Sequence, residues 1–228
     1  MKKLLSMTLA LALLLSLAGT AMAATDPDTL VIGVTTMNGD FIDGFGNSSY
    51  DAYIKRVLNA NYYSTVYQTA ADELVVNPQV VKDYKVEANE VGDKTYTWTI
   101  VDDLKWSDGS AITAKDFVFG TLFASAPAWV EAGASSGSAG YGLVGYRAWN
   151  AGDADAFAGI KLIDDYTFSM TIDHEELPYF YEISYASATP APLSVYAPGV
   201  DIVSDENGVK FVGKDVDQST IAAERAPL

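Results

Sequence analysis

His174 is the side chain of this sequence best suited to proton transfer, because an imidazole titrates near neutral pH. It is the single histidine of the chain, it stands beside Glu175 and Glu176, and the chain holds no cysteine. A histidine with neighbouring carboxylates can act in acid and base catalysis, but catalysis also needs a nucleophile or a positioned substrate. These residues follow a predicted strand, so we interpret them as a solvated turn and expect no enzymatic activity.

A segment rich in glycine and serine, residues 133–145, matches two patterns that carry chemistry. Ser135 lies between glycines at the spacing of a nucleophile elbow, and Gly140, Gly142 and Gly145 have the spacing of a dinucleotide-binding turn. Both patterns require a buried strand before them and a helix after them, whereas small polar residues precede them here. We interpret the segment as a loop.

Asp153 and Asp155 have the alternate spacing of carboxylates in a calcium loop. The glycine and the terminal glutamate of such a loop are missing, and His174 has no second histidine or cysteine with which to bind a transition metal. We therefore predict no metal site and no cofactor.

The elements that position these side chains must be predicted from local patterns, and these patterns are clearest between residues 96 and 120. Tyr96, Trp98 and Ile100 alternate as in a strand with one buried face, and the residues Ser-Asp-Gly at 107–109 favour a reversal of the chain. Thr113 followed three residues later by Asp116 has the spacing of a helix capping box. The segment therefore predicts strand, turn and helix.

The rest of the chain has shorter signals of the same kinds, and together they indicate an α/β protein with antiparallel hairpins. The predicted elements are a strand at 30–34, a helix at 48–59 capped by Ser48, hairpins at 80–101, 159–173 and 203–212, and a helical stretch at 177–186.

The first residues have the composition of a secretory signal peptide. Lys2 and Lys3 precede an apolar run, 4–18, that is shorter than the roughly 20 residues needed to span a bilayer, and small residues follow at Ala21 and Ala23. We expect a signal peptide at 1–23 and a mature chain at 24–228. Because the sequence holds no cysteine, we expect neither a lipid anchor through cysteine nor a disulfide.

The chain is strongly acidic, with a formal net charge of −16 at pH 7. Such a field repels phosphate backbones and anionic membrane surfaces, and no basic cluster offers a local exception. Nucleic acid is therefore excluded as an expected partner.

Several of these segments, in this order, resemble the extracytoplasmic solute-binding proteins of family 5, which deliver oligopeptides, dipeptides or nickel to ABC importers. The segments that carry the resemblance are Asn77-Pro78, Trp98, 106–109, 113–118, 159–168, 177–180 and 190–192. The resemblance implies an α/β fold that forms a partial first lobe of a two-lobed, periplasmic-binding-protein type II-like structure, with a mixed sheet, β-hairpins and surrounding helices. Residues 24–228 are then the N-terminal part of the solute-binding domain, lobe I, and the second lobe is absent.

The resemblance also implies a function and a site. It predicts the substrate-binding component of an ABC importer, a monomer that captures oligopeptides or dipeptides in the periplasm or the extracellular cell-surface space and delivers them to the permease subunits. Relatives bind the main chain of the peptide as an added strand. The implied ligand contacts lie on the loop after the first strand, at Thr36, Met37, Asn38 and Asp40.

Two alternatives remain open at this point. If Ser135 lies on an elbow against a strand, the chain is a secreted hydrolase or a carbohydrate-binding module. The second alternative is a remnant that binds nothing, because one partial lobe cannot enclose a ligand. We accordingly expect weak or undetectable binding of peptides by this chain alone.

Overall fold

The computed structural model describes residues 33–39, 48–57, 63–131, 134 and 138–213. The chain divides into two units, Met1–Met37 and Asn38–Leu228. In the first unit, the described residues 33–37 are exposed and have no regular secondary structure, so Gly33 and Val34 do not form the end of the predicted strand. The predicted signal peptide lies outside the described residues.

The second unit is organised around a four-stranded sheet. Its strands are β3 (Val81–Ala88), β4 (Lys94–Ile100), β5 (Ile160–Asp164) and β6 (Thr167–Ile172), in the order β3-β4-β6-β5. Both predicted hairpins of this sheet are confirmed. All strand pairs among the described residues are antiparallel, which corrects the mixed sheet expected above. The hairpins β3–β4 and β5–β6 each reverse the chain direction, and they join through the antiparallel pair β4–β6.

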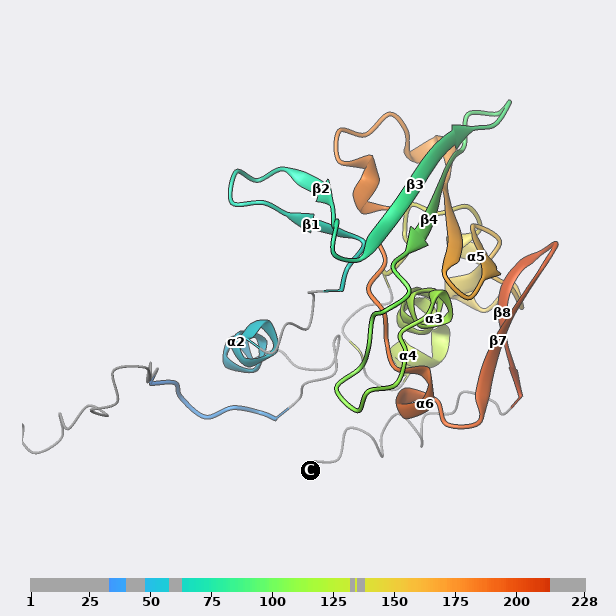
Figure 1. Cartoon of the computed structure of the whole chain (residues 1–228). Coiled ribbons are helices and arrows are strands. Elements are labelled where there is room, and N and C mark those ends of the chain that lie inside the picture. The colour runs from blue at the N-terminus through green and yellow to red at the C-terminus, as the bar shows by residue number, and fades with distance from the viewer. Residues whose placement is uncertain (1–32, 40–47, 58–62, 132–133, 135–137, 214–228) are drawn as a thin grey trace, which may run out of the picture. The chain divides into compact units, whose positions relative to one another are not determined.

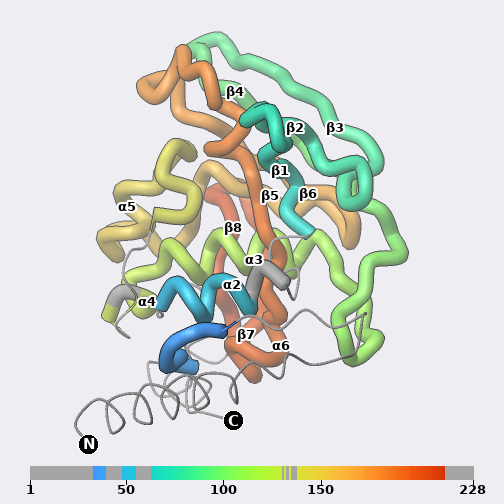
Figure 2. The backbone as a smooth tube through the Cα atoms, turned by 90° about the vertical axis from the view of Figure 1, so that its left-hand side faces the viewer, coloured from blue at the N-terminus to red at the C-terminus, as the bar shows by residue number. Residues whose placement is uncertain are grey.

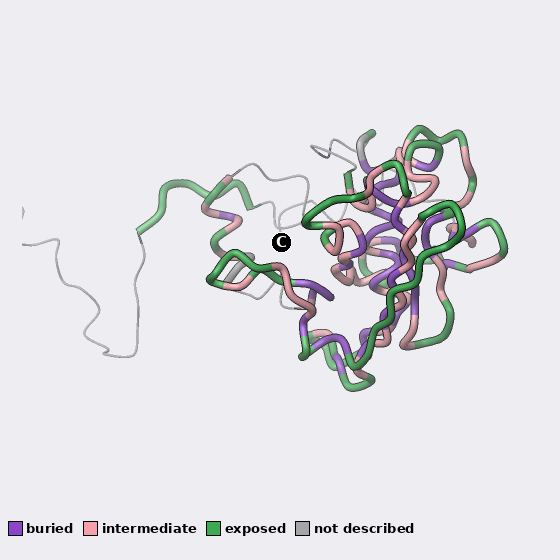
Figure 3. The backbone as a smooth tube through the Cα atoms, turned by 90° about the horizontal axis from the view of Figure 1, so that it is seen from above, coloured by how far each residue is buried: buried purple, intermediate pink, exposed green. Residues whose placement is uncertain are grey.

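The two faces of the central strands differ sharply in polarity. Side chains on one face are almost completely buried and apolar: Tyr96, Trp98, Ile100, Phe168, Met170 and Ile172. The opposite face is made largely of threonine and serine, and the hydroxyls of Thr95 and Thr171 lie 3.0 Å apart on neighbouring strands. The alternation predicted for β4 is therefore confirmed, because its alternate apolar side chains face the core. Figure 3 shows buried segments gathered in this part of the chain, while β3 remains exposed.

Helix α3 (Ala114–Ser125) packs on the buried face of the sheet, as Figure 1 shows. The predicted capping box forms through Asp116, whose carboxylate accepts hydrogen bonds from the amide of Thr113 at 2.8 Å and from its hydroxyl at 3.2 Å. Phe117 then stacks on Phe168 of β6 with ring centroids 5.6 Å apart. The turn at 107–109, predicted from Asp108 and Gly109, also forms.

A further hairpin, β7 (Val200–Asp205) and β8 (Gly208–Gly213), covers another side of α3. It turns on Glu206 and Asn207, as predicted, and Val209 forms a bridge with Phe157 just before β5. Phe211 of β8 contacts Phe119 of α3 edge to face, with ring centroids 6.3 Å apart.

Shorter elements complete the described part of the chain. They are the helices α2 (Ser49–Val57), α4 (Pro127–Glu131), α5 (Tyr146–Ala151) and α6 (Leu193–Tyr196), the hairpin of β1 (Val66–Gln68) and β2 (Leu74–Val76), and the 3-10 turns η1 (His174–Glu176) and η2 (Glu182–Ser184). The Ser48 hydroxyl accepts from the amide of Tyr50 at 3.3 Å, which confirms the predicted cap of α2. No helix in the described ranges is both long enough and apolar enough to span a bilayer.

The helical stretch predicted at 177–186 is wrong. Only η2 is helical there, and its backbone bonds run to the third residue back, as from the amide of Ser184 to the carbonyl of Tyr181. The aromatic rings of this stretch contact one another instead, such as Tyr179 with Tyr185 at 5.1 Å between centroids. Aromatic residues favour helices only weakly, so packing decides the local structure.

Candidate functional site

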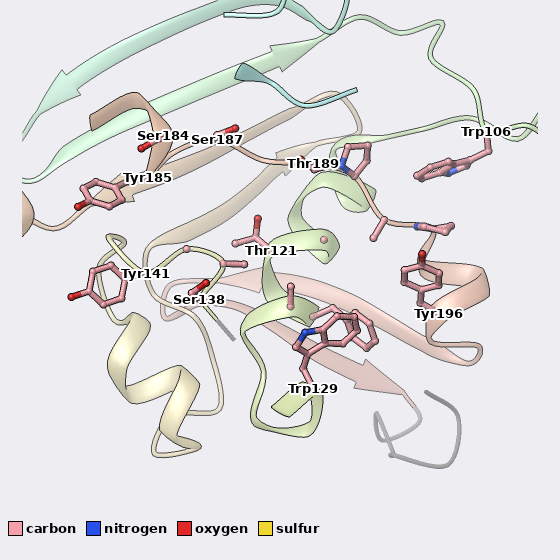
Figure 4. A pocket seen from close by; sticks show the side chains of 18 residues that line it. Trp106, Thr121, Trp129, Ser138, Tyr141, Ser184, Tyr185, Ser187, Thr189 and Tyr196 are labelled. Atoms are coloured by element: carbon pink, nitrogen blue, oxygen red, sulfur yellow. The ribbon is translucent and has the colours of Figure 1, made fainter. Parts of the chain in front are cut away.

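A cavity of about 800 Å³ lies beside α3 and opens to solvent (Figure 4). Its wall is assembled from α3, α4, α6, the loop at 138–141 and the segment from η2 to residue 192. The lining residues are Trp106, Gly120, Thr121, Phe123, Ala124, Trp129, Ser138, Ala139, Gly140, Tyr141, Ser184, Tyr185, Ser187, Thr189, Pro190, Ala191, Pro192 and Tyr196. We refer to this site as the neutral cavity.

The neutral cavity combines aromatic rings with hydroxyl groups. Trp106, Trp129, Tyr141, Tyr185 and Tyr196 supply the rings, and serine and threonine supply further hydroxyls. Among the residues that line it, none carries a charge. Such a wall can bury apolar groups and form hydrogen bonds with neutral polar ones, whereas an unpaired charge placed there would lose its hydration without a partner.

Gly120 allows one wall of the neutral cavity to lie directly on α3. A Cβ atom at this position would come 2.1 Å from the backbone carbonyl oxygen of Thr189 and 3.4 Å from the amide nitrogen of Ala191. The amide of Ala191 in turn donates to the carbonyl of Asp116 on the same helix at 3.1 Å. Figure 2 shows this segment passing α3 on its way to α6. Only glycine fits so close a backbone contact without displacing the segment.

The same segment is fixed from the other side by residues just before β1. The hydroxyls of Ser64 and Thr189 lie 2.6 Å apart, and the amide of Ala188 donates to the hydroxyl of Thr65 at 2.9 Å. The indole of Trp98 adds a third connection, because its Nε1 donates to the carbonyl of Ala186 at 3.0 Å. The wall at 186–192 is therefore tied to three separate parts of the fold.

Turn η2, which leads into the cavity wall, is held by a charged contact with the sheet. Lys94 donates to both carboxylate oxygens of Glu182, at 2.6 and 2.7 Å, and the hydroxyl of Tyr96 donates to the same carboxylate at 2.9 Å. Burial and the neighbouring carboxylate of Glu182 both raise the pKa of Tyr96. The tyrosine therefore remains a neutral donor at physiological pH.

The described glycines of the segment at 133–145 allow close packing against neighbouring side chains. A Cβ atom at Gly142 would lie 2.5 Å from the ring of Tyr185, one at Gly140 would lie 3.1 Å from the ring of Phe157, and one at Gly145 would lie 3.1 Å from Ala158. These contacts explain the glycine spacing without a bound phosphate. Ser135 and the glycines beside it lie outside the described residues, so the elbow interpretation is not tested.

A smaller cavity of about 240 Å³ shares the Tyr141 wall with the neutral cavity. It is lined by Tyr141, Leu143, Gly145, Tyr146, Arg147, Ala148, Asp173, Glu175 and Glu176. Three of these residues are acidic and one is basic, so we refer to it as the acidic cavity. It was not predicted from the sequence, because its residues come from two segments with no common motif.

His174 lies next to the acidic cavity and pairs with a residue far away in sequence. Its Nδ1 is 2.8 Å from Oδ1 of Asp93, at the β3–β4 turn, and 3.3 Å from Oδ1 of Asp173. The three side chains place possible metal-ligand atoms within 4.8 Å of one another, but the hydrogen bonds among them account for this arrangement. The predicted turn is confirmed, and its half-exposed imidazole has a carboxylate partner that sequence reasoning missed.

The titration of this pair follows from its contacts. The hydrogen bond to Asp93 raises the pKa of His174, and the charges of Asp93, Asp173 and Glu175 add to the effect. Burial alone would raise the pKa of Asp93, but hydrogen bonds from Asn89 and His174 outweigh it and hold that pKa below its ordinary value. The contribution of His174 to stability is fully present below about pH 6.5 and is lost as the pH rises through its raised pKa. The contribution of Asp93 is fully present above about pH 3.9 and is lost as the pH falls through its lowered pKa. The contact is therefore strongest between these limits.

We expect Asp93→Asn to lower the pKa of His174 toward its ordinary value, because the ion pair is removed while the side-chain shape is kept. The chain holds one histidine, so its Hε1 proton resonance gives an unambiguous titration curve. Asp83→Asn, an exposed change on β3, is the matched control and should leave the curve in place. A curve unaltered by Asp93→Asn would show that Asp93 does not set this pKa.

The ligand contacts implied by the resemblance fall in a different part of the chain. Thr36, Met37 and Asn38 are exposed and without regular secondary structure, and Asp40 lies outside the described residues. Thr36 and Met37 belong to the first unit, whereas Asn38 belongs to the second. These residues therefore remain a proposal, while the two cavities are built from other segments.

Comparisons with known proteins all point to one family. Residues 75–217 match the model of the bacterial extracellular solute-binding proteins, family 5 Middle. The chain is 34% identical over 108 residues to the periplasmic oligopeptide-binding protein OppA of Salmonella typhimurium, an alignment that covers 44% of this chain and 19% of that protein. It is 30% identical over 140 residues to the probable deoxycholate-binding periplasmic protein YgiS of Escherichia coli, covering 59% of this chain and 25% of the relative.

A solved structure agrees at the level of the fold. Lactococcal OppA, complexed with an endogenous peptide in the closed conformation, superimposes with a TM-score of 0.53 and 20% sequence identity, covering 79% of this chain and 37% of that one. The chain thus matches well under half the length of each of these proteins. The expected α/β fold class is confirmed, and the described fold matches part of an OppA-type periplasmic binding protein. The family match extends over most of the chain, from before β3 to the end of β8, and the chain therefore belongs to the bacterial extracellular solute-binding proteins of family 5.

Proposed function

We propose that this chain is part of the substrate-binding component of an ABC importer and that its neutral cavity contacts oligopeptides or dipeptides. The observation that carries the proposal is an open, uncharged, aromatic cavity of about 800 Å³ in a member of family 5. A relative of this family is named for oligopeptide binding. Peptides with varied side chains have neutral amide groups in common, and the cavity supplies groups that suit them.

The geometry supports binding without turnover. Rings such as Trp129 and Tyr185 can cover apolar side chains of a peptide, while the hydroxyls of Thr121 and Ser187 can exchange hydrogen bonds with its amides. The ligand is held by contact area and hydrogen bonds, so we propose that the chain is not an enzyme. Because one open wall encloses only part of a ligand, we expect the affinity of this chain alone to be weak.

The proposal extends to location and partners. We propose export by the segment at 1–23, a monomeric chain outside the cytoplasmic membrane, transfer of ligand to permease subunits, and a second ligand contact from Thr36, Met37, Asn38 and Asp40. N-terminal sequencing of the exported protein checks the first point, with Ala24 as the expected first residue.

The four tryptophans allow a direct test of peptide binding. Trp106 and Trp129 line the neutral cavity, whereas Trp98 and Trp149 are buried and donate their indole hydrogens to Ala186 and Ser125. Titration of the ¹⁵N-labelled chain with Gly-Phe-Gly amide should shift the indole resonances of Trp106 and Trp129 and leave the other two unchanged. Because NMR detects fast exchange, it registers the weak affinity expected here.

Ala124→Leu should block the cavity and weaken peptide binding by about tenfold or more, a loss of about 1.4 kcal/mol. Ala151→Leu, at the exposed end of α5, is the matched control and should bind as the unmodified chain does. Shifts spread over all four indoles, or none at saturating peptide, would contradict the proposal. Hydrolysis of the peptide during the titration would instead favour the hydrolase alternative, and selective shifts with deoxycholate alone would replace peptide as the ligand class.

A further inference from the structure

Thr121 differs from the other hydroxyl-bearing residues that line the neutral cavity in its burial and its hydrogen bonding. Only 5% of the residue is exposed. Figure 4 shows its side chain projecting from α3 into the cavity. Its hydroxyl forms no hydrogen bond with any residue that the structure describes. Burial of a hydroxyl without a partner costs free energy, so this group is suited to pair with a polar atom from outside the fold.

Two other hydroxyls of the cavity wall are used within the fold. The hydroxyl of Thr189 is paired with that of Ser64, and the hydroxyl of Ser184 donates to the carbonyl of Tyr181 at 2.7 Å. A threonine inside a helix commonly donates to the carbonyl three or four residues before it. Thr121 lies inside α3, and its hydroxyl makes no such bond within the described helix. It therefore remains available to the cavity.

Packing fixes the position of this hydroxyl. The methyl group of Thr121 lies beside Gly140, where a Cβ atom would come within 3.1 Å of it. The hydroxyl of Ser125 donates to the backbone carbonyl of Thr121 at 2.7 Å, and Phe117 anchors the same helix on β6. A functional group carried by a packed helix is held more precisely than one carried by a loop. The Thr121 hydroxyl is therefore in place before a ligand arrives.

The wall of the neutral cavity near Thr121 is aromatic. Phe123 and Trp129 pack edge to face with ring centroids 4.5 Å apart, and Phe123 also contacts Tyr196 at 6.0 Å. Ala124, which follows Thr121 by three residues and shares its side of α3, adds little side-chain volume beside these rings. In an open cavity of about 800 Å³ this wall can admit one more aromatic ring, supplied by a ligand.

We propose that Thr121 selects peptides with an aromatic side chain that ends in a hydroxyl group, as that of tyrosine does. The proposal rests on the proposed function and names a specificity-determining residue for it. Thr121 is more deeply buried than Ser187, so a ligand side chain reaches its hydroxyl more readily than the ligand main chain does. Phenol and threonine hydroxyls each donate and accept, so they can pair in either direction. Phenylalanine fills the same space and leaves Thr121 without a partner.

Two peptides that differ by one hydroxyl group test the proposal. Gly-Tyr-Gly amide should bind the unmodified chain about three- to tenfold more tightly than Gly-Phe-Gly amide, measured from the indole shifts of Trp106 and Trp129. Thr121→Val keeps the side-chain shape without the hydroxyl, so the ratio should fall to about one while the phenylalanine peptide binds at least as tightly as before. Thr121→Ser keeps the hydroxyl and should still favour the tyrosine peptide.

Thr97→Val is the matched control, because it removes a threonine hydroxyl from the polar face of β4, opposite α3, and should preserve the ratio. The indole resonances of the buried Trp98 and Trp149 report whether each variant keeps its fold. Thr121→Ala also lacks the hydroxyl, and it replaces Thr121→Val in the comparison if the valine variant does not fold.

Equal binding of the two peptides to the unmodified chain would overturn this inference and leave the proposed function intact. So would an unchanged ratio in the folded variant that lacks the Thr121 hydroxyl. Absence of binding by both peptides would overturn the proposed function and this inference with it.

Discussion

Replacing Trp98 with alanine is expected to lower the free energy of unfolding by about 3 to 5 kcal/mol. The indole is completely buried at the centre of β4 and is stacked against Tyr84 and Tyr96, with ring centroids 5.5 and 5.6 Å away. Its removal leaves a large cavity in the core and leaves the carbonyl of Ala186 without its indole donor. Urea denaturation followed by far-ultraviolet circular dichroism measures the loss.

Trp98→Phe separates the two contributions. Phenylalanine keeps a ring between the tyrosines but cannot donate to Ala186, so the expected loss is smaller, about 1 to 3 kcal/mol. The wall of the neutral cavity at 186–192 should also become more mobile, which amide hydrogen exchange at Ala188 reports. Tyr67→Ala, an exposed change in β1, is the control and should cost little. A Trp98→Ala loss no larger than that of the control would refute the packing described for β4.

Gly120→Ala is expected to destabilise the chain by about 1 to 3 kcal/mol, although alanine favours a helix more than glycine by about 1 kcal/mol. The sign is set by the carbonyl oxygen of Thr189, 2.1 Å from the position of the new Cβ atom. Either α3 or the segment at 189–192 must move, and both belong to the neutral cavity. The indole resonances of Trp106 and Trp129 should therefore shift even without ligand.

Gly33→Ala provides the comparison for this substitution, because its Cβ atom would meet nothing within 4 Å and its backbone lies outside the left-handed region. Its free energy of unfolding should stay within about 0.5 kcal/mol of that of the unmodified chain. A stabilising Gly120→Ala would mean that helix propensity dominates and that the close approach of Thr189 to α3 is wrong.

Local chemistry made much of the fold predictable. The cap at Thr113 and Asp116, the turn on Asn207 and the alternation of Tyr96, Trp98 and Ile100 each depend on a few consecutive residues, and each forms as predicted. The helix predicted at 177–186 does not form, because contacts with distant residues, such as Glu182 with Lys94 of β4, outweigh local preference there.

The candidate site was far less accessible to sequence reasoning. The neutral cavity joins Trp106 to residues near 121, 140, 185 and 196, and no motif links these positions. Asp93 and His174 are 81 residues apart, so neither residue reveals the other. The proximity of Gly120 to Thr189 is equally invisible, because a glycine within a helical pattern has no sequence signature that distinguishes packing from simple tolerance.

The hydrogen bonds between Ser64 and Thr189 and between Thr65 and Ala188 join segments more than 120 positions apart. Loop closure over such a span is slow, and contacts of this kind delay folding. The capped helix and the hairpins can form early, because their contacts are local, whereas the wall of the neutral cavity at 186–192 must wait until the distant residues 64 and 65 have reached it. The wall of the neutral cavity at 186–192 should therefore become ordered among the last parts of this unit.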